Sequence, residues 1–222
     1  RLTEVQNGED FGKLVEQIAS QRAGFQTRLA AAEIWPLFGL PLGFTLGDIL
    51  SDVFFGDEAV WMSGVVAILT NGSKTDAKAA DTLRVLDLRA PTSSTLMALE
   101  DCLLNKGGSA DPSKHFAAKI GSFPTKPVQP LLGDLIDPLN NLMARVEAAR
   151  AKRIALSAAE KTLALHDFAA VFLPDYAARK AARGYLDFDD LITRAKALLT
   201  DPSLAAWVLY RLDGGIDHIL VD

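Results

Sequence analysis

The residue with the clearest potential for chemistry is an aspartate that ends an apolar run. Asp222 follows His218, Ile219, Leu220 and Val221. Such a run predicts a buried parallel strand, and strands of this kind place the residue that follows them at the edge of the sheet where ligands bind in open α/β folds. Carboxylate oxygens are the ligands that Mg²⁺ prefers. We therefore take Asp222 as a candidate Mg²⁺ ligand.

A second stretch is similar to a phosphate-binding loop but does not meet its requirements. Such a loop needs a glycine directly before Lys and Ser/Thr, and another glycine at a fixed distance before that. Here Ser73 stands between Gly72 and Lys74, and Ile68 occupies the position of the earlier glycine. We interpret residues 71–75 as a turn between two helices.

Basic residues are concentrated in one part of an acidic chain. The formal net charge is −5, but residues 145–183 contain eight Lys or Arg and four acids, a balance of +4, which leaves −9 for the remainder. A basic stripe on an acidic body is typical of local phosphate contact and equally of a solvated helix face. The candidate DNA-binding residues are Arg145, Arg150, Lys152, Arg153, Arg179, Lys180 and Arg183.

The cysteine and histidine residues indicate no catalytic or metal site. Cys102 is the one cysteine, so an internal disulfide is excluded and a reducing cytoplasm is expected. It lies in an apolar helical pattern with no local base, which predicts helix packing. His166 does not form a metal-ligand spacing with His115 or His218, and we expect it at the edge of a core. No acid, base or nucleophile constellation favours an autonomous enzyme.

Length and composition are typical of one or two globular domains. Of the 222 residues, 49% are hydrophobic and 23% charged, which is enough for a substantial core. No apolar stretch approaches the roughly 20 residues that a bilayer requires, and no signal peptide is indicated, so we expect no membrane partner. Because the chain begins at Arg1 without an initiator methionine, we expect an excised segment of a longer parent protein.

Hydrophobic spacing predicts a mainly α fold with a short C-terminal strand. Pro174 should kink or break the longest helical run near Phe172. Asp187 is expected to cap the helix that follows, with Asp190 at its third position. The predicted helices are residues 9–33, 46–55, 61–69, 76–88, 94–105, 131–183, 186–200 and a further one from 201; the predicted strand is 216–222, and its sheet should lie outside this chain.

Two motifs near the end of the chain occur together in one known family. The segment Asp187-Phe188-Asp189-Asp190-Leu191 precedes His218-Ile219-Leu220-Val221-Asp222 by about thirty residues. This pair resembles the Asp-Phe-x-x-Leu helix and the Walker B strand of UvrD-type superfamily-one DNA helicases. Residues 210–222 are most similar to the AddA subunit family of bacterial AddAB helicase–nucleases, and the specific resemblance covers about residues 172–222.

The resemblance implies an ATP-driven translocase that unwinds duplex DNA ends during recombinational repair of double-strand breaks. It also implies an AddB-type partner subunit and a nuclease activity in the parent. There Asp222 would help to hold Mg²⁺ at the ATP phosphates, and a following glutamate would activate water. The sequence contains no Gly-Lys-Ser/Thr, no glutamate after Asp222 and no nuclease motif. We therefore expect ATP and Mg²⁺ to bind the parent, and we expect this chain alone to lack enzyme activity.

Two functions are therefore predicted. In the first, residues 1–185 are a helical insertion domain of the first RecA-like motor domain and contact duplex DNA, while residues 186–222 return to the RecA-like core and end at the Walker B strand. Asp187, Phe188, Asp190 and Leu191 then form the structural motif at the start of the return segment. In the second, the chain is a non-catalytic helical scaffold or a protein-interaction domain.

Overall fold

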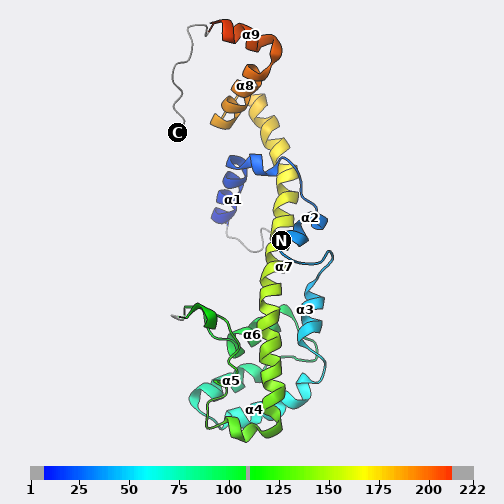
Figure 1. The fold of residues 1–222 in the computed structure, drawn as a ribbon, viewed down its shortest axis with the longest axis vertical. Coiled ribbons are helices and arrows are strands. Elements are labelled where there is room, and N and C mark those ends of the chain that lie inside the picture. The colour runs from blue at the N-terminus through cyan, green and yellow to red at the C-terminus, as the bar shows by residue number, and fades with distance from the viewer. Residues whose placement is uncertain (1–7, 109–110, 212–222) are drawn as a thin grey trace. The chain divides into compact units, whose positions relative to one another are not determined.

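The computed structural model describes residues 8–108 and 111–211, and these form a helical structure (Figure 1). The only β pairing among them is an isolated antiparallel bridge between Leu104 and Ala118. The helices are α1 (Gly8–Ser20), α2 (Ala31–Leu37), α3 (Leu46–Val53), α4 (Glu58–Thr70), α5 (Lys74–Arg84), α6 (Ser93–Leu103), α7 (Ile136–Arg183), α8 (Phe188–Thr200) and α9 (Pro202–Arg211), with 3-10 turns η1 (Arg22–Phe25), η2 (Pro112–Lys114) and η3 (Gln129–Leu135).

The mainly α prediction is confirmed for the described residues. The predicted strand and Asp222 lie outside them, and the RecA-like core stays a prediction. The chain divides into two compact units. Unit 1 is Thr27–His166, and the described part of unit 2 is Gly8–Gln26 with residues 167–211. The predicted boundary between residues 185 and 186 concerns a larger motor, and it also stays a prediction.

Unit 1 has a single apolar core, to which the first part of α7 contributes. Figure 1 shows α4, α5 and α6 gathered around this part of the helix. The buried residues of α7 repeat at helical spacing and pack against side chains from α2 to α6. They include Leu139, Leu142, Met143, Val146 and Leu156 from α7, with Ile34, Ile49, Leu69, Leu96 and Leu99 from the other helices.

Polar side chains determine where the unit 1 helices begin. Thr45 caps α3 and accepts a hydrogen bond from the Asp48 N–H, while the Asp48 carboxylate accepts from the Thr45 N–H at 2.7 Å. Thr92 caps α6 in the same way, so this helix begins at Ser93, one residue before its predicted start at residue 94. The helices predicted over 46–55, 61–69 and 76–88 are confirmed with shifted ends.

The stretch that is similar to a phosphate loop is a turn between α4 and α5, as predicted. Ser73 caps α5, and the buried carboxylate of Asp76 accepts hydrogen bonds from the N–H and hydroxyl of Ser73 and of Thr125. A Cβ at Gly72 would lie 2.8 Å from that of Asp76, so the glycine is required for close packing. The carboxylate of Asp76, which these hydrogen bonds hold in place, therefore fills the space beside the turn.

Unit 2 is built on the end of α7 and corrects two predictions. The helix expected over 9–33 ends at Ser20, because the chain turns through η1 and directs Arg22 to the start of α8. Pro174 does not break α7. It removes one backbone hydrogen bond, but Phe168, Phe172 and Tyr176 stack in sequence, with centroids 5.4 and 5.6 Å apart, and this stack spans the proline.

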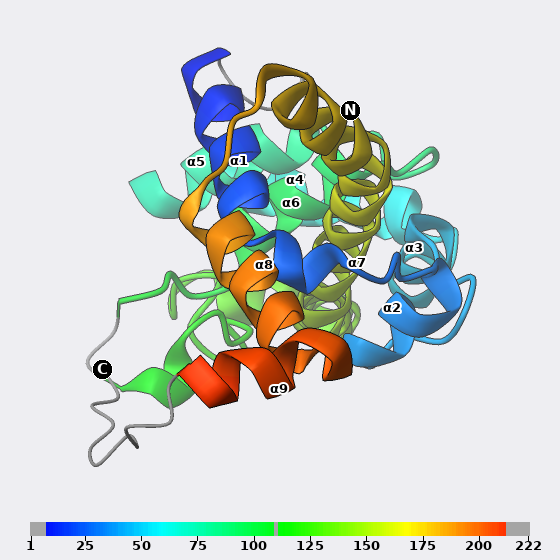
Figure 2. The ribbon, with the colours of Figure 1, turned by 90° about the horizontal axis from the view of Figure 1, so that it is seen from above.

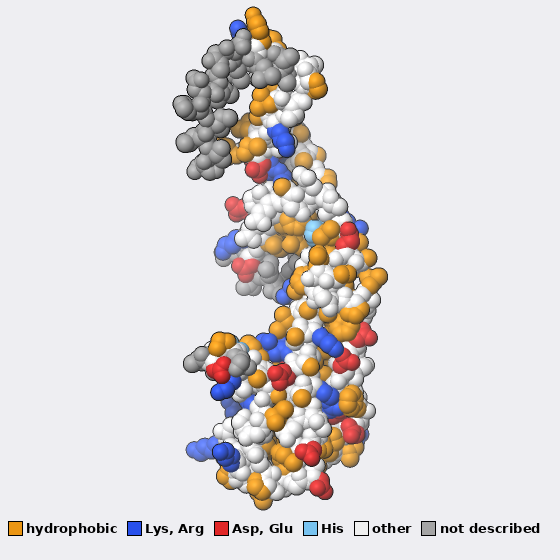
Figure 3. All heavy atoms as spheres, in the orientation of Figure 1, with side chains coloured by type: hydrophobic (Ala, Val, Ile, Leu, Met, Phe, Trp, Pro, Cys, Tyr) orange, Lys and Arg blue, Asp and Glu red, His pale blue; other side chains and the backbone are white. Residues whose placement is uncertain are grey.

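Helices α8 and α9 are consecutive and meet at a sharp angle (Figure 2). The predicted starts of both helices are confirmed: Asp187 caps α8, and α9 begins at Pro202. Many apolar side chains of these helices are exposed, as the space-filling view shows (Figure 3). They include Phe188, Leu191, Ile192, Leu198, Leu199, Leu204, Trp207 and Tyr210.

Within the described ranges, no single helix has both the length and the apolar character to cross a membrane. The bent pair α3 and α4 meets that test only when its two helices are taken together, with 61° between them. Ile49, Val53, Val65 and Leu69 of this pair are fully buried in unit 1, which is the burial of core helices.

Candidate functional site

Unit 2 contains a network of charged residues at the first turn of α8, which we call the carboxylate clasp (Arg22, Lys180, Asp187 and Asp190). Asp187 caps the helix, because its side chain accepts from the Asp190 N–H at 3.0 Å. The Asp190 carboxylate accepts in return from the Asp187 N–H at 3.1 Å. This capping box fixes both carboxylates at the end of the helix that favours negative charge.

Two cations from distant parts of the sequence bind these carboxylates. The Arg22 guanidinium donates two parallel hydrogen bonds to Asp187, at 2.9 and 2.7 Å, and a third to Asp190 at 3.0 Å. The Lys180 ammonium donates to both aspartates. Hydrogen bonds from Arg22 and then Lys180 hold the pKa of Asp187 far below its usual value, and that of Asp190 is lowered first by Lys180. Sequence reasoning missed Arg22, because nothing local identifies a partner 165 residues away.

The clasp makes unit 2 sensitive to acid. A carboxyl group whose pKa is lower in the folded than in the unfolded chain stabilises the fold at neutral pH, and this contribution is lost as pH falls below about 4, the unfolded value. We expect the urea midpoint of unit 2, followed by far-UV circular dichroism, to decrease as pH falls below about 4. The decrease should be smaller in Asp187→Asn, and an equal decrease in both proteins would contradict this role.

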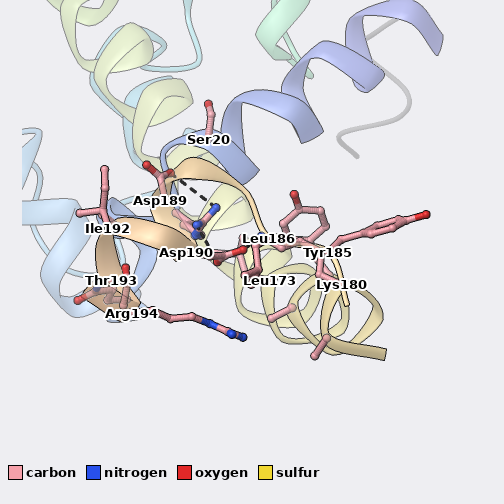
Figure 4. Close-up of a pocket in the computed structure, with 16 residues that line it drawn as sticks. Ser20, Leu173, Lys180, Tyr185, Leu186, Asp189, Asp190, Ile192, Thr193 and Arg194 are labelled. Atoms are coloured by element: carbon pink, nitrogen blue, oxygen red, sulfur yellow. Dashed lines mark hydrogen bonds and ion pairs between the residues drawn. The ribbon is translucent and has the colours of Figure 1, made fainter. Parts of the chain in front are cut away.

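Two grooves adjoin the clasp. The larger, about 740 Å³, is lined by the end of α7, the chain around Arg22 and the first turns of α8 (Figure 4). The smaller, about 330 Å³, we call the arginine groove; it is lined by Tyr176, Arg179, Lys180, Arg183, Tyr185, Leu186 and Asp187. Three of the seven predicted DNA-binding residues therefore line one groove. Arg179 makes an ion pair of 2.9 Å with Asp175 on its own helix, with both side chains exposed.

The other predicted DNA-binding residues lie in unit 1, where each forms an ion pair with a carboxylate. Arg145 donates to the buried Glu58 at 2.9 Å and lies over the Phe55 ring. Lys152 pairs with Asp52 at 2.7 Å on the surface. The remaining pairs of this set join Arg150 and Arg153 to Glu100.

The Glu100 pairs are partly buried. Arg153 donates two hydrogen bonds of 2.7 Å to the Glu100 carboxylate. Arg150 lies 3.6 Å from the same carboxylate and stacks over the Phe116 ring, with 3.5 Å between its guanidinium carbon and the centroid. These charges are therefore largely directed into unit 1. Their contact with DNA stays a prediction.

The remaining candidates for chemistry have structural environments. Cys102 packs against the apolar core of unit 1, as the helix-packing prediction requires, and burial raises the pKa of its thiol to about 11. His166 is buried and accepts from the Leu29 N–H at 3.5 Å. Across residues 8–108 and 111–211, no three or more His, Cys, Asp or Glu side chains are grouped so as to hold a metal ion. Asp222 lies outside this part of the chain.

Comparison with known proteins identifies one family. The model of the UvrD/REP helicase N-terminal domain matches residues 46–222, which includes most of unit 1, the end of α7 and both carboxylates of the clasp. No curated protein matches the chain. No solved structure matches it either.

Proposed function

Since the chain belongs to the UvrD/REP helicase N-terminal domain family, we propose that it forms the helical part of an ATP-dependent DNA helicase and contacts duplex DNA. The family match is the observation that carries this proposal. It extends over helices α3 to α6 and the part of α7 in unit 1, as well as the Asp187–Leu191 motif. The exposed arginines of the arginine groove support the DNA contact, because cations on the surface are what a phosphate backbone binds.

The finer assignments rest on the resemblance of residues 210–222 to the AddA subunit family. We propose that the parent acts on duplex DNA ends in the cytoplasm, in recombinational repair of double-strand breaks, with a nuclease activity and an AddB-type partner subunit. Helicases of this family use ATP and Mg²⁺, and the hydrolysis of ATP drives their movement along DNA. Asp222 is the proposed Mg²⁺ ligand in the parent. The part proposed for the described helices is to hold DNA.

Among the seven basic candidates, exposure distinguishes two groups. Lys152, Arg179 and Arg183 are exposed, and we propose that they contact phosphates directly. The other four are bound to carboxylates and less exposed, and we propose that they chiefly position the helices that carry the contacts: Arg145, Arg150, Arg153 and Lys180. Each phosphate contact would carry no sequence information.

The double substitution Arg179→Gln, Arg183→Gln tests the DNA contact without breaking a buried ion pair. Each phosphate contact contributes about 0.9 to the slope of log affinity against log salt concentration. We expect the double variant to lower the magnitude of this slope by about two and to bind about tenfold more weakly at low salt. The measurement is fluorescence anisotropy with a blunt DNA hairpin across a series of NaCl concentrations.

A matched control keeps the same change in charge. The double variant Lys161→Gln, Lys196→Gln removes two exposed cations outside both grooves, from α7 and α8. Its slope should stay close to that of the unsubstituted chain. If both double variants change the slope equally, the slope depends on the total charge of the chain, and the proposed contact at Arg179 and Arg183 is contradicted.

One observation favours the second candidate function, a protein-interaction domain. The exposed apolar residues of α8 and α9, such as Phe188, Ile192 and Trp207, form the kind of surface that binds another protein surface. DNA binding that is absent or insensitive to salt would favour this function over the first.

A further inference from the structure

An aromatic side chain covers one of the cations of unit 1. The ring of Phe116 lies over the guanidinium group of Arg150, with 3.5 Å between the guanidinium carbon and the ring centroid. The Arg150 side chain is 24% exposed and Phe116 is 38% exposed, which places the ring on the solvent side of the pair. Arginine stacks well on aromatic faces, and a stacked ring occupies the space through which a phosphate oxygen would approach.

The backbone of Phe116 is strained. Its φ is +56°, the one positive value outside glycine among residues 8–108 and 111–211. For a bulky residue this conformation costs free energy and persists only where other contacts hold it. The chain directly after Phe116 is held in this way, because the Asn105 N–H donates to Ala117 O at 2.9 Å and the Lys119 N–H donates to Leu103 O at 3.0 Å. The ring is thereby kept over the guanidinium group.

A glycine makes room for the ring. A Cβ at Gly107 would lie 2.8 Å from Cζ of Phe116 and 3.1 Å from its Cε2. The first distance is closer than Cβ atoms approach other atoms, so a side chain at residue 107 would displace the ring. The backbone of Gly107 lies outside the left-handed region, so an alanine is compatible with its conformation. The position of the ring over Arg150 therefore depends on the absence of a side chain at Gly107.

Arg150 is bound only weakly to a carboxylate. Glu100 already accepts two hydrogen bonds of 2.7 Å from Arg153. Arg150 lies 3.6 Å from the same carboxylate, which is beyond the distance of a hydrogen bond. The charge of Glu100 is thus matched without Arg150, and movement of the Phe116 ring would leave the Arg150 guanidinium able to bind another anion.

We propose that Phe116 is a movable cover of Arg150, and that its displacement adds a phosphate contact to the DNA-binding surface of the chain. The inference rests on the proposed function that the chain contacts DNA, and it adds a means of regulating that contact. With the ring in place, Arg150 positions helices; with the ring displaced, its guanidinium binds a phosphate. Strain at Phe116 opposes the stacking, which lowers the cost of displacement. DNA that binds only the uncovered arginine shifts the population toward it.

Two substitutions uncover Arg150 in different ways. Gly107→Ala displaces the ring, whereas Phe116→Gly removes it and relieves the backbone strain. By anisotropy with the blunt hairpin, we expect each to increase the magnitude of the slope of log affinity against log salt concentration by about 0.9, the value of one added contact. Arg150→Gln should abolish this increase in the Gly107→Ala background and have no effect on the slope in the unsubstituted chain, where the arginine is covered.

Phe55→Ala is the matched control. Phe55 is also an exposed phenylalanine, and its ring lies 4.0 Å from the guanidinium carbon of Arg145. Because Arg145 donates to the buried Glu58 at 2.9 Å, it stays bound without the ring, and the slope should not change. A second measurement requires no DNA: phenylglyoxal, which modifies accessible guanidinium groups, should modify Arg150 faster in Gly107→Ala than in the unsubstituted chain, as followed by peptide mass spectrometry.

The outcomes separate this inference from the proposed function. A steeper slope in both uncovered variants that Arg150→Gln abolishes supports the inference. An unchanged slope in variants that bind the hairpin, or an unchanged rate of Arg150 modification in Gly107→Ala, overturns the cover while the DNA contact stands. An equal increase in Phe55→Ala also overturns it. Absence of DNA binding in every variant overturns the inference and the proposed function together.

Discussion

Replacement of Glu58 by alanine is expected to destabilise unit 1 by about 3–5 kcal/mol, the usual cost of removing one partner of a buried ion pair. The Glu58 side chain is fully buried at the start of α4. It accepts from the N–H groups of Phe55 and Gly56 at 2.9–3.0 Å and from Arg145 at 2.9 Å. Its loss leaves two backbone donors and one guanidinium without their acceptor in a low-dielectric environment.

The pKa of Glu58 depends on two opposing effects, burial and the contacts that stabilise the carboxylate. Burial alone would raise it, but the hydrogen bonds from the Phe55 and Gly56 N–H groups, with the charge of Arg145, bring it below its usual value. Glu58 is therefore held as a carboxylate inside unit 1. This balance explains why a charged residue can be accommodated where the surrounding side chains are apolar.

Tryptophan fluorescence can isolate unit 1 in this measurement. Trp35 and Trp61 belong to unit 1, and Trp207 belongs to unit 2, so a Trp207→Phe background removes the signal of unit 2. Urea unfolding then compares Glu58→Ala with Asp57→Ala. The latter removes a neighbouring exposed carboxylate that makes no side-chain cap. A loss below about 1 kcal/mol in Glu58→Ala, the value of a surface ion pair, would contradict the structural account.

Much of the helical structure could be predicted because its signals are local. Thr45, Ser73 and Asp187 each accept a hydrogen bond from a backbone N–H three residues later, so the sequence around each residue contains the whole interaction. Glu58 could not be predicted in this way. Its hydrogen bonds from the Phe55 and Gly56 N–H groups are local, but its ion pair joins it to Arg145, 87 residues away, and that contact exists only after α4 and α7 pack together.

In the candidate site, too, local contacts could be predicted from the sequence and distant ones could not. Asp187 and Asp190 were predicted as the start of a helix, and that local part is confirmed. Arg22 could not be assigned to them, because a single arginine in η1 contains no information about a partner at the start of α8. Tyr185 was also not singled out, since an aromatic residue after Gly184 has no periodic signal, and it lines the arginine groove only because the end of α7 places it beside the arginines.

Pro174 shows how tertiary contacts override a strong local rule. A proline within a helix removes a hydrogen bond and usually kinks or ends the helix. In unit 2 the aromatic residues Phe168, Phe172 and Tyr176 follow one face of α7 on both sides of the proline, and Phe11 of α1 packs edge-on against Phe168 at 5.8 Å. Pro174 itself is exposed on the helix surface. The helix is continuous through the proline, and this packed face lies on both sides of it.

Glu100→Ala is expected to have an effect as large as Glu58→Ala, about 3–5 kcal/mol, because it leaves Arg153 partly buried without a partner. The carboxylate accepts two hydrogen bonds of 2.7 Å from Arg153 and lies 3.6 Å from Arg150. Arg153→Met should cost less, because Arg150 remains beside Glu100. If the pair is coupled, Glu100→Ala with Arg153→Met should destabilise unit 1 by less than the sum of the single changes.

The same double-mutant cycle decides what Arg153 does in the proposed function. Urea unfolding in the Trp207→Phe background gives the coupling free energy, which we expect to exceed about 1 kcal/mol for a bidentate, partly buried pair. Anisotropy with the blunt hairpin gives the effect on DNA binding. If Arg153 positions helices, Arg153→Met should leave the salt dependence of binding unchanged while it lowers stability. Additive stabilities, together with a slope reduced by about one, would instead make Arg153 a direct phosphate contact.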